Sequence, residues 1–229
     1  MVEGAQPHAG SSTPRWIRTW HLLMVLVFGN VAVAAFLNHR VLTDEVYLSL
    51  FSVNASPIQA EDHLAITRRL ERWGYLLGPV GLLARVGGTS LLVQLTLLPF
   101  QLDPGFARVL RASAWAYLVL LLGTVFHAAW LFYLPSAAIT PDTLEAMPGS
   151  LAGALSGFLE PSALEDFGAV ATLLRQVTVF DLGWIVVFVL ALENRRDLPA
   201  IPALVSVLGV WAALTLSRWA LFLYLVRAG

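Results

Sequence analysis

Apolar residues gather along the chain in five long runs, and most charged residues lie between them. The runs fall near residues 20–37, 75–100, 112–134, 176–192 and 203–226. An α-helix rises 1.5 Å per residue, so about 20 apolar residues cross the ~30 Å hydrocarbon core of a bilayer. The pattern therefore predicts an all-α, polytopic transmembrane helical bundle with five spans, in a single membrane domain over residues 15–229.

The polar stretches before and between the first runs have different characters. Residues 1–14 are small, polar and proline-bearing, which predicts a disordered tail because they have almost nothing to bury. Residues 38–74 contain a turn near Asn54–Pro57 and then a helix-like stretch with Leu64 and Leu70 between charged positions. This spacing predicts an amphipathic extramembrane helix on the membrane surface, in the first outer loop.

Arginines are distributed unevenly among the connections. Short connections carry the pairs Arg15 and Arg18, Arg108 and Arg111, and Arg195 and Arg196. The connection over residues 135–171 has five acidic residues and no arginine. The positive-inside rule then predicts a cytoplasmic N-terminus and tail, with both long connections and the C-terminus outside. Five arginines on the predicted outer side oppose this assignment: Arg40, Arg68, Arg69 and Arg72 in the first long connection and Arg227 near the C-terminus.

The first apolar run has a second interpretation. Small residues at Ala32, Val33 and Ala34 are typical of the region before a signal-peptide cleavage site. If the run were cleaved, four spans would be left. Retention as the first span is the prediction, and cleavage is the alternative.

Composition narrows the class of protein. Hydrophobic residues make up 58% of the 229 residues and charged residues 13%, against about 25% charged in soluble domains. The chain has no cysteine, which excludes disulfides and thiolate metal sites. Its formal net charge is -1, and the basic residues show no field that would attract nucleic acid. The expected partners are membrane lipids and other membrane proteins or further copies, with no nucleic acid.

Each predicted span contains one conspicuous polar or ionisable residue. These residues are Asn30, Arg85, His127, Asp181 and Arg218. Counted at 1.5 Å per residue from the outer ends of the spans, they lie roughly 7 to 15 Å inside. A charged side chain in hydrocarbon costs ~2.5 to 3.5 kcal/mol on insertion scales, so such residues usually have partners. We therefore predict an intramembrane polar layer in which Asp181 pairs with Arg85 and Arg218.

Two roles fit this polar layer. In the structural one, the residues only hold helices together, or the arginines extend to the outer surface along their apolar stems. In the functional one, they line a polar cavity that opens outward and takes a small ligand, a lipid headgroup or a proton. The sequence leaves both open.

Motifs of catalysis and metal binding are missing from the sequence. His127 has no histidine or acid three or four residues away within its span, so the helical spacing of a metal site is lacking. There is no GxSxG or HExxH motif, and "GPVGLLARVGG" lacks the lysine of a phosphate-binding loop. Acidic pairs such as Glu61-Asp62 and Glu165-Asp166 are typical of solvated loops. We expect no enzymatic activity, no catalytic residue, no metal and no cofactor.

Three segments carry a resemblance to a known family. They are "YLLGPVGLLARVGGTSLLVQL", "FARVLRASAWAYLVLLLG" and "LLRQVTVFDLGWIVVFVLAL". Together they resemble the bacterial members of the Yip1-like family of five-span membrane proteins, over residues 70–226. Only Leu77, Gly78 and Pro79 correspond to the Asp-Leu-Tyr-Gly-Pro signature of eukaryotic members. The resemblance implies a five-span architecture and a non-enzymatic interaction role, and no catalytic motif is carried over.

These observations lead to one expected function and one alternative. We expect a multi-pass protein of the bacterial cytoplasmic (inner) membrane with a non-catalytic binding, scaffold or accessory-subunit role in a membrane protein complex. The alternative is a small transporter or channel-like protein that uses the intramembrane polar layer.

Overall fold

The fold is described from a computed structural model of the chain. The residues that it describes are 15–52, 56–140, 143–144, 149–152, 173–174, 177–193 and 198–228. The predicted disordered tail at residues 1–14 lies outside these residues, as do Arg195, Arg196 and most of the acidic connection.

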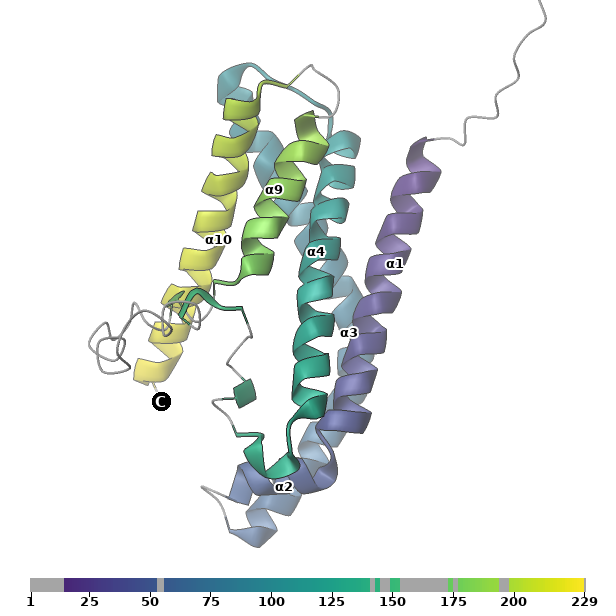
Figure 1. The fold of residues 1–229 in the computed structure, drawn as a ribbon, viewed down its shortest axis with the longest axis vertical. Coiled ribbons are helices and arrows are strands. Elements are labelled where there is room, and N and C mark those ends of the chain that lie inside the picture. The colour runs from purple at the N-terminus through teal and green to yellow at the C-terminus, as the bar shows by residue number, and fades with distance from the viewer. Residues whose placement is uncertain are drawn as a thin grey trace, which may run out of the picture.

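Helices account for nearly all of the described chain. In order they are α1 (Arg15–Phe36), the π-helix η1 (Leu37–Val41), α2 (Asp44–Ser52), α3 (Pro57–Leu97), the 3-10 helix η2 (Leu98–Phe100), α4 (Phe106–Tyr133), the 3-10 helix η3 (Ser136–Ala138), α9 (Val179–Glu193) and α10 (Ala200–Ala228). Five of them, α1, α3, α4, α9 and α10, run along the long axis of the molecule, while α2 lies across one end (Figure 1). The described part contains no strand, only an isolated bridge between Ser150 and Thr178. The predicted all-α class is confirmed.

Four helical segments are long and apolar enough to cross a membrane. They are Thr19–Val41, Ile58–Phe100, Phe106–Tyr133 and Ala200–Leu221. The prediction of a multi-pass membrane protein is therefore supported. The predicted span at 176–192 corresponds to α9, which has 15 residues. At 1.5 Å per residue it is roughly 22 Å long, less than a ~30 Å core, so five full spans are not confirmed.

Helix α3 differs from the sequence prediction because it is one continuous helix of 41 residues. The predicted amphipathic helix and the second span are its two halves. It begins with a capping box, in which the Gln59 N–H donates to Ser56 Oγ and the Ser56 N–H donates to Gln59 Oε1. Pro79 lies inside the helix without ending it. Since α3 is roughly 60 Å long, its charged first half projects beyond a ~30 Å core.

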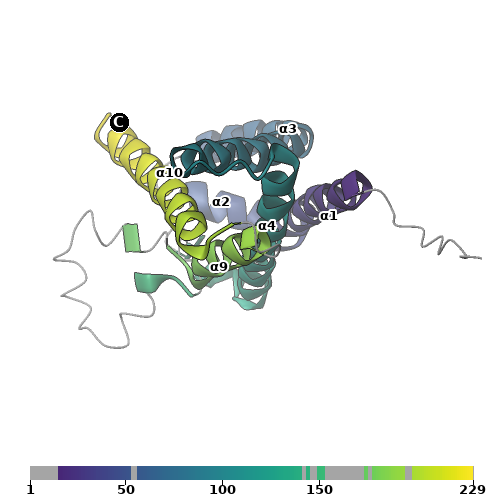
Figure 2. The same ribbon diagram turned by 90° about the horizontal axis from the view of Figure 1, so that it is seen from above.

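Helix α4 occupies the centre of the bundle, between α1, α3 and α9 (Figure 2). Small residues are buried along it, among them Ala112, Ser113, Ala114, Ala116 and Gly123. Small residues let helix backbones approach closely, which is how membrane helices pack without a hydrophobic driving force. The bundle is therefore built on α4.

The α4–α9 contact is antiparallel and close. A Cβ atom built on Gly123 would lie 2.7 Å from Cγ of Phe180, and one built on Gly183 would lie 3.0 Å from Val119. Tyr117 packs edge-on against Trp184, with ring centroids 6.1 Å apart. Helix α9 thus covers the half of α4 that leads from Arg108 to Gly123, and it begins about half-way along the bundle (Figure 1).

The chain enters α9 through a short paired segment. The Leu151 N–H donates to the Val177 carbonyl at 2.8 Å, and the Val179 N–H donates to the Gly149 carbonyl at 3.0 Å. Ser150 and Thr178 are both buried. Non-helical backbone at membrane depth is tolerated only where it is buried in protein or lines a cavity. The pairing therefore lets a short helix begin inside the bundle.

Candidate functional site

The predicted polar layer divides into separate environments in the structure. Asn30 is half-buried on α1, and His127 is half-buried on α4 with its ring 5.8 Å from that of Trp130. Asp181 lies in the first turn of α9. Arg85 and Arg218 line a common pocket.

Asp181 does not form the predicted ion pair. Its carboxylate accepts hydrogen bonds from the Thr178 N–H at 2.8 Å and the Thr178 hydroxyl at 2.6 Å. In return, the Asp181 N–H donates to the Thr178 Oγ1 at 3.3 Å. This is a capping box, which satisfies N–H groups that a helix start leaves free. Among the described residues the ion pairs within 4.0 Å are those of Arg68, so the prediction of an Asp181–arginine pair is corrected.

His127 also lies apart from other chemistry-bearing groups. Its Nδ1 is buried and has no hydrogen-bond partner in the described part of the chain. Within the same residues, no group of three or more His, Cys, Asp and Glu side chains is placed to hold a metal ion. His127 therefore has no ligand set around it there.

The pocket that contains both predicted arginines lies between three helices. It is lined by Arg85 of α3, Tyr117 of α4, and Leu214, Ser217, Arg218 and Leu221 of α10. Its volume is about 230 Å³. The Tyr117 hydroxyl lies 3.0 Å from the Thr89 Oγ1, and Ser217 donates to the Ala213 carbonyl at 2.7 Å. No acidic side chain is among the described residues that line the pocket.

The two arginines reach the same level of the bundle. Helices α3 and α10 are joined by a hydrogen bond from Ser206 Oγ to the Thr96 carbonyl, at 3.3 Å. Counted from that contact toward the α2 end, Arg85 lies roughly 17 Å along α3 and Arg218 roughly 18 Å along α10. Both charges also act electrostatically on the Tyr117 hydroxyl. The geometry therefore concentrates positive charge in one pocket.

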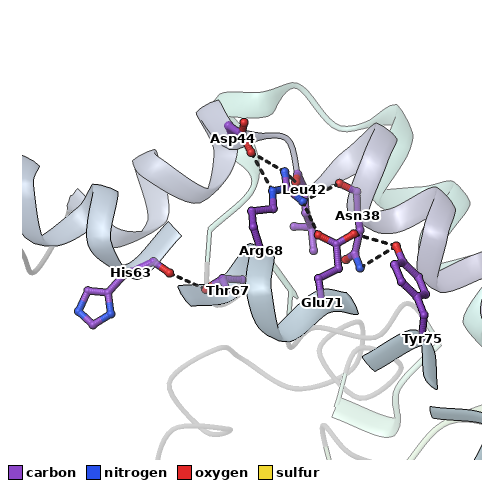
Figure 3. A network of polar contacts seen from close by, with 8 residues as sticks. All are labelled: Asn38, Leu42, Asp44, His63, Thr67, Arg68, Glu71 and Tyr75. Atoms are coloured by element: carbon purple, nitrogen blue, oxygen red, sulfur yellow. Dashed lines mark hydrogen bonds and ion pairs between the residues drawn. The ribbon is translucent and has the colours of Figure 1, made fainter. Parts of the chain in front are cut away.

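A second polar cluster lies at the end of the bundle where α2 crosses α3 (Figure 3). Its centre is Arg68, whose guanidinium donates to the Asp44 carboxylate at 2.6 and 2.9 Å and to the Glu71 carboxylate at 2.9 Å. It also donates to the backbone carbonyls of Asn38, at 3.3 Å, and Leu42, at 3.2 Å. A guanidinium has five N–H donors, so five hydrogen bonds use all of them.

Around Arg68, further groups complete the cluster. The Tyr75 hydroxyl donates to Glu71 at 2.8 Å and accepts from the Asn38 amide at 3.3 Å. The Tyr47 ring lies beneath the guanidinium, 5.2 Å from its carbon. A cavity of about 510 Å³ adjoins the cluster, lined by His39, Asp44, Arg68, Glu71, Arg72 and Tyr75.

Burial and hydrogen bonding act in opposite directions on Glu71. Its side chain is only 11% exposed, and burial by itself would raise the pKa of the carboxyl. The hydrogen bonds from Arg68 and Tyr75 and the charge of Arg68 outweigh burial, so the pKa of Glu71 lies below its ordinary value. Glu71 and Arg68 are therefore both charged at neutral pH, and the cluster acts as a clamp between α3 and the 38–47 segment.

Sequence reasoning missed this Arg68 cluster. Arg68, Glu71 and Tyr75 recur at three and four residues, which places them on one face of a helix. The spacing of these three residues in the sequence could therefore have indicated a polar cluster. The sequence interpretation placed Arg68 and Glu71 in a surface helix and Tyr75 at the start of the second span, because nothing local indicates that α2 folds back onto them.

Comparisons with known proteins give no match to any family model, curated protein or solved structure. The resemblance to Yip1-like proteins therefore stays a prediction. The function has to be argued from the pocket and the cluster themselves.

Proposed function

We propose that this multi-pass membrane protein has a non-catalytic binding role, and that the pocket of Arg85, Tyr117 and Arg218 binds an anionic group. One observation carries the proposal: two guanidinium groups from α3 and α10 line one pocket, with no acid among the described residues around it. Isolated charges at membrane depth are costly, and an ionisable residue there is a candidate functional residue by default. An anion supplied from outside the chain would remove that cost.

The contrast with Arg68 supports this assignment. Arg68 has all five donors in hydrogen bonds to its own chain. In the described part of the chain, Arg85 and Arg218 have neither a hydrogen bond nor an ion pair. Asp181, the acid expected to neutralise them, is held by Thr178 instead. The pocket arginines therefore keep their donors for a ligand.

A scaffold or accessory-subunit role is the form of this proposal in which the anion belongs to another membrane protein. A carboxylate on a partner helix would pair with Arg85 and Arg218 as a lipid or a solute would. Quantitative co-purification in mild detergent tests this form. A defined partner that is lost from an Arg85→Gln/Arg218→Gln variant would support it, and recovery of the chain alone would count against it.

The alternative is a small transporter or channel-like protein. It is favoured by α9, which begins inside the bundle after a non-helical segment, as discontinuous helices at transporter sites do. Against it, that segment is buried and paired, and the Asp181 carboxylate is used by the helix cap. Anion flux into liposomes that depends on Arg85 and Arg218 would favour transport over binding alone.

We further propose a place in the bacterial cytoplasmic membrane with the N-terminus in the cytoplasm and α9 as a short fifth crossing. Two contacts support this orientation. Arg111 Nε donates to Thr19 at 3.0 Å and Arg108 donates to the Leu192 carbonyl at 2.6 Å, so these arginines share one end with the start of α1. The arginines of the first long connection oppose this orientation, because acidic partners such as those of Arg68 count little in the positive-inside rule.

The binding role is tested by thermal stabilisation of the purified full-length chain. Inorganic phosphate, acetate and phosphatidylglycerol would be added separately, since a ligand that binds only the folded state raises the melting temperature. At least one should stabilise the native chain and leave the Arg85→Gln/Arg218→Gln variant unchanged. If all three leave the native chain unchanged, the pocket is not an anion site.

A further inference from the structure

We propose that the anion is the phosphate of an anionic membrane phospholipid, which enters the pocket from the bilayer between α3 and α10. This inference rests on the proposed binding role and names the source of its ligand. An anionic phospholipid and a free phosphate ion would both present a phosphate group to the pocket. A free phosphate ion is the competing source.

The donors of the pocket match a phosphate. Arg85 and Arg218 each present a planar fork of N–H groups, and such forks bind phosphate oxygens in pairs. Tyr117 and Thr89 share a single hydrogen bond at 3.0 Å, so when Thr89 donates, the Tyr117 O–H is left to donate into the pocket. Two positive charges also favour a headgroup with net negative charge over a zwitterionic one.

The walls of the pocket match a lipid better than a solute. Leu214 and Leu221 lie four residues before and three residues after Arg218, so all three share one face of α10. Leu221 is 59% exposed, and it joins the pocket to the apolar outer surface of the helix. A phospholipid presents a charged phosphate flanked by apolar chains. A free phosphate ion, in contrast, would have to leave its water for leucine walls.

Access to the pocket along α3 is open. One and two turns before Arg85, on the same face of α3, are Gly81 and Gly78. A Cβ atom built on either glycine would meet no other atom within 4 Å. At these two positions of the described α3, therefore, no side chain stands in the way of a headgroup arriving from the end of the bundle where Tyr75 lies.

The experiment measures lipid binding to the delipidated full-length protein by native mass spectrometry in detergent. The probes are phosphatidylglycerol, phosphatidylcholine, diacylglycerol and inorganic phosphate at equal concentration. We expect phosphatidylglycerol to bind tightest. In an Arg85→Gln/Arg218→Gln variant its dissociation constant should rise at least about tenfold, since hydrogen bonds to charged groups are worth ~1.5 to 3 kcal/mol.

A matched control removes two positive charges elsewhere. Arg40 and Arg69 are exposed and belong to neither the pocket nor the Arg68 cluster, so Arg40→Gln/Arg69→Gln should leave phosphatidylglycerol binding unchanged. An equal loss in this control would overturn the proposal, because the lipid would then respond to net charge alone.

The outcomes separate the inference from the proposed binding role. If inorganic phosphate binds with the same dependence on Arg85 and Arg218 and phosphatidylglycerol does not, the lipid source is wrong and the anion site stands. If neither binds in an arginine-dependent way, the lipid inference fails, and the binding role fails with it when acetate and co-purification also show no dependence on Arg85 and Arg218. Should the double variant not fold, a photoactivatable phosphatidylglycerol tests the native chain directly. Cross-links within 214–221 of α10 or 78–85 of α3 are expected, and cross-links confined to α1 and α9 would overturn the inference.

Discussion

The Asp181 carboxylate is bound to Thr178, accepting hydrogen bonds from the Thr178 N–H at 2.8 Å and from its hydroxyl at 2.6 Å. A carboxylate in the first turn also lies at the positive end of the helix dipole. The only acid that the sequence offered to the pocket arginines therefore stabilises the start of α9. This one relationship stabilises the start of α9 inside the bundle, and it leaves Arg85 and Arg218 without a counter-charge among the described residues.

Removal of the cap should destabilise the protein without involving the arginines. Asp181→Ala should lower the free energy of unfolding by about 1 kcal/mol, the usual cost of losing a helix cap. Denaturant unfolding of the detergent-solubilised protein, followed by circular dichroism, measures this change. Asp181→Asn should cost less, because the amide oxygen still accepts from Thr178.

A double-mutant cycle separates the cap from the ion pair that the sequence predicted. Asp181→Ala and Arg218→Gln should lower the free energy of unfolding additively, within about 0.5 kcal/mol, because the residues share no partner in the described structure. A larger coupling energy would show that Asp181 and Arg218 interact, and the Asp181 carboxylate would then not serve the helix cap alone.

Arg68 should be the most sensitive arginine at the α2 end of the bundle. Arg68→Ala leaves the Glu71 carboxylate, which is 11% exposed, without its charged partner, so stability should fall by on the order of 2 kcal/mol. Arg68→Lys should recover only part of the stability that Arg68→Ala loses, since an ammonium has three donors and no planar fork. Melting temperatures measure both changes. The exposed neighbour variant Arg69→Ala is the matched control and should melt within about 2 °C of the native protein.

Glu71 should make stability depend on pH in the acid range. Its pKa in the folded protein lies below the ordinary value of 4.5, so its stabilising contribution is fully present above pH 4.5 and is lost as the pH falls through the folded pKa. The native protein should therefore be more stable than Glu71→Gln at pH 7. Melting temperatures measured from pH 7 to pH 3 should converge at the acid end. A gap that stays constant down to pH 3 would contradict the charged form of Glu71.

Long apolar runs predicted the membrane-spanning bundle, because a stretch such as 112–134 has no alternative to burial in protein or lipid. The same reasoning failed at residues 57–74. Charges there indicated a separate surface helix, yet a helix does not end where it leaves the membrane, and α3 continues through Gly78 and Pro79. Polarity along a sequence therefore marks the membrane boundary better than it marks helix ends.

For the candidate site, the sequence named a layer of five residues, and two of them, Arg85 and Arg218, line one pocket in the structure. Their similar estimated depth was the signal that grouped them. Depth alone cannot say which side of α4 a residue faces, and Asp181 also had a closer partner three residues earlier in Thr178. Local capping competes with long-range pairing and wins here because it orders fewer side chains.

The close contact between α4 and α9 at Gly123 gives the sharpest test of the fold. A Cβ atom at Gly123 would lie 2.7 Å from Cγ and 3.1 Å from Cβ of Phe180, atoms that cannot move away without a shift of α9. Gly123→Ala should therefore lower stability by about 1 to 3 kcal/mol, as overpacking does.

At Gly29 the nearest atom is the terminal Cδ2 of Leu121, at 2.6 Å, so Gly29→Ala needs only a new leucine rotamer and should cost less. Gly209→Ala meets nothing within 4 Å and should match or exceed native stability, because alanine favours a helix over glycine. Melting temperatures should thus fall in the order Gly209→Ala, Gly29→Ala, Gly123→Ala, and a Gly123→Ala protein as stable as the Gly209→Ala one would mean that α9 does not pack on α4 as described.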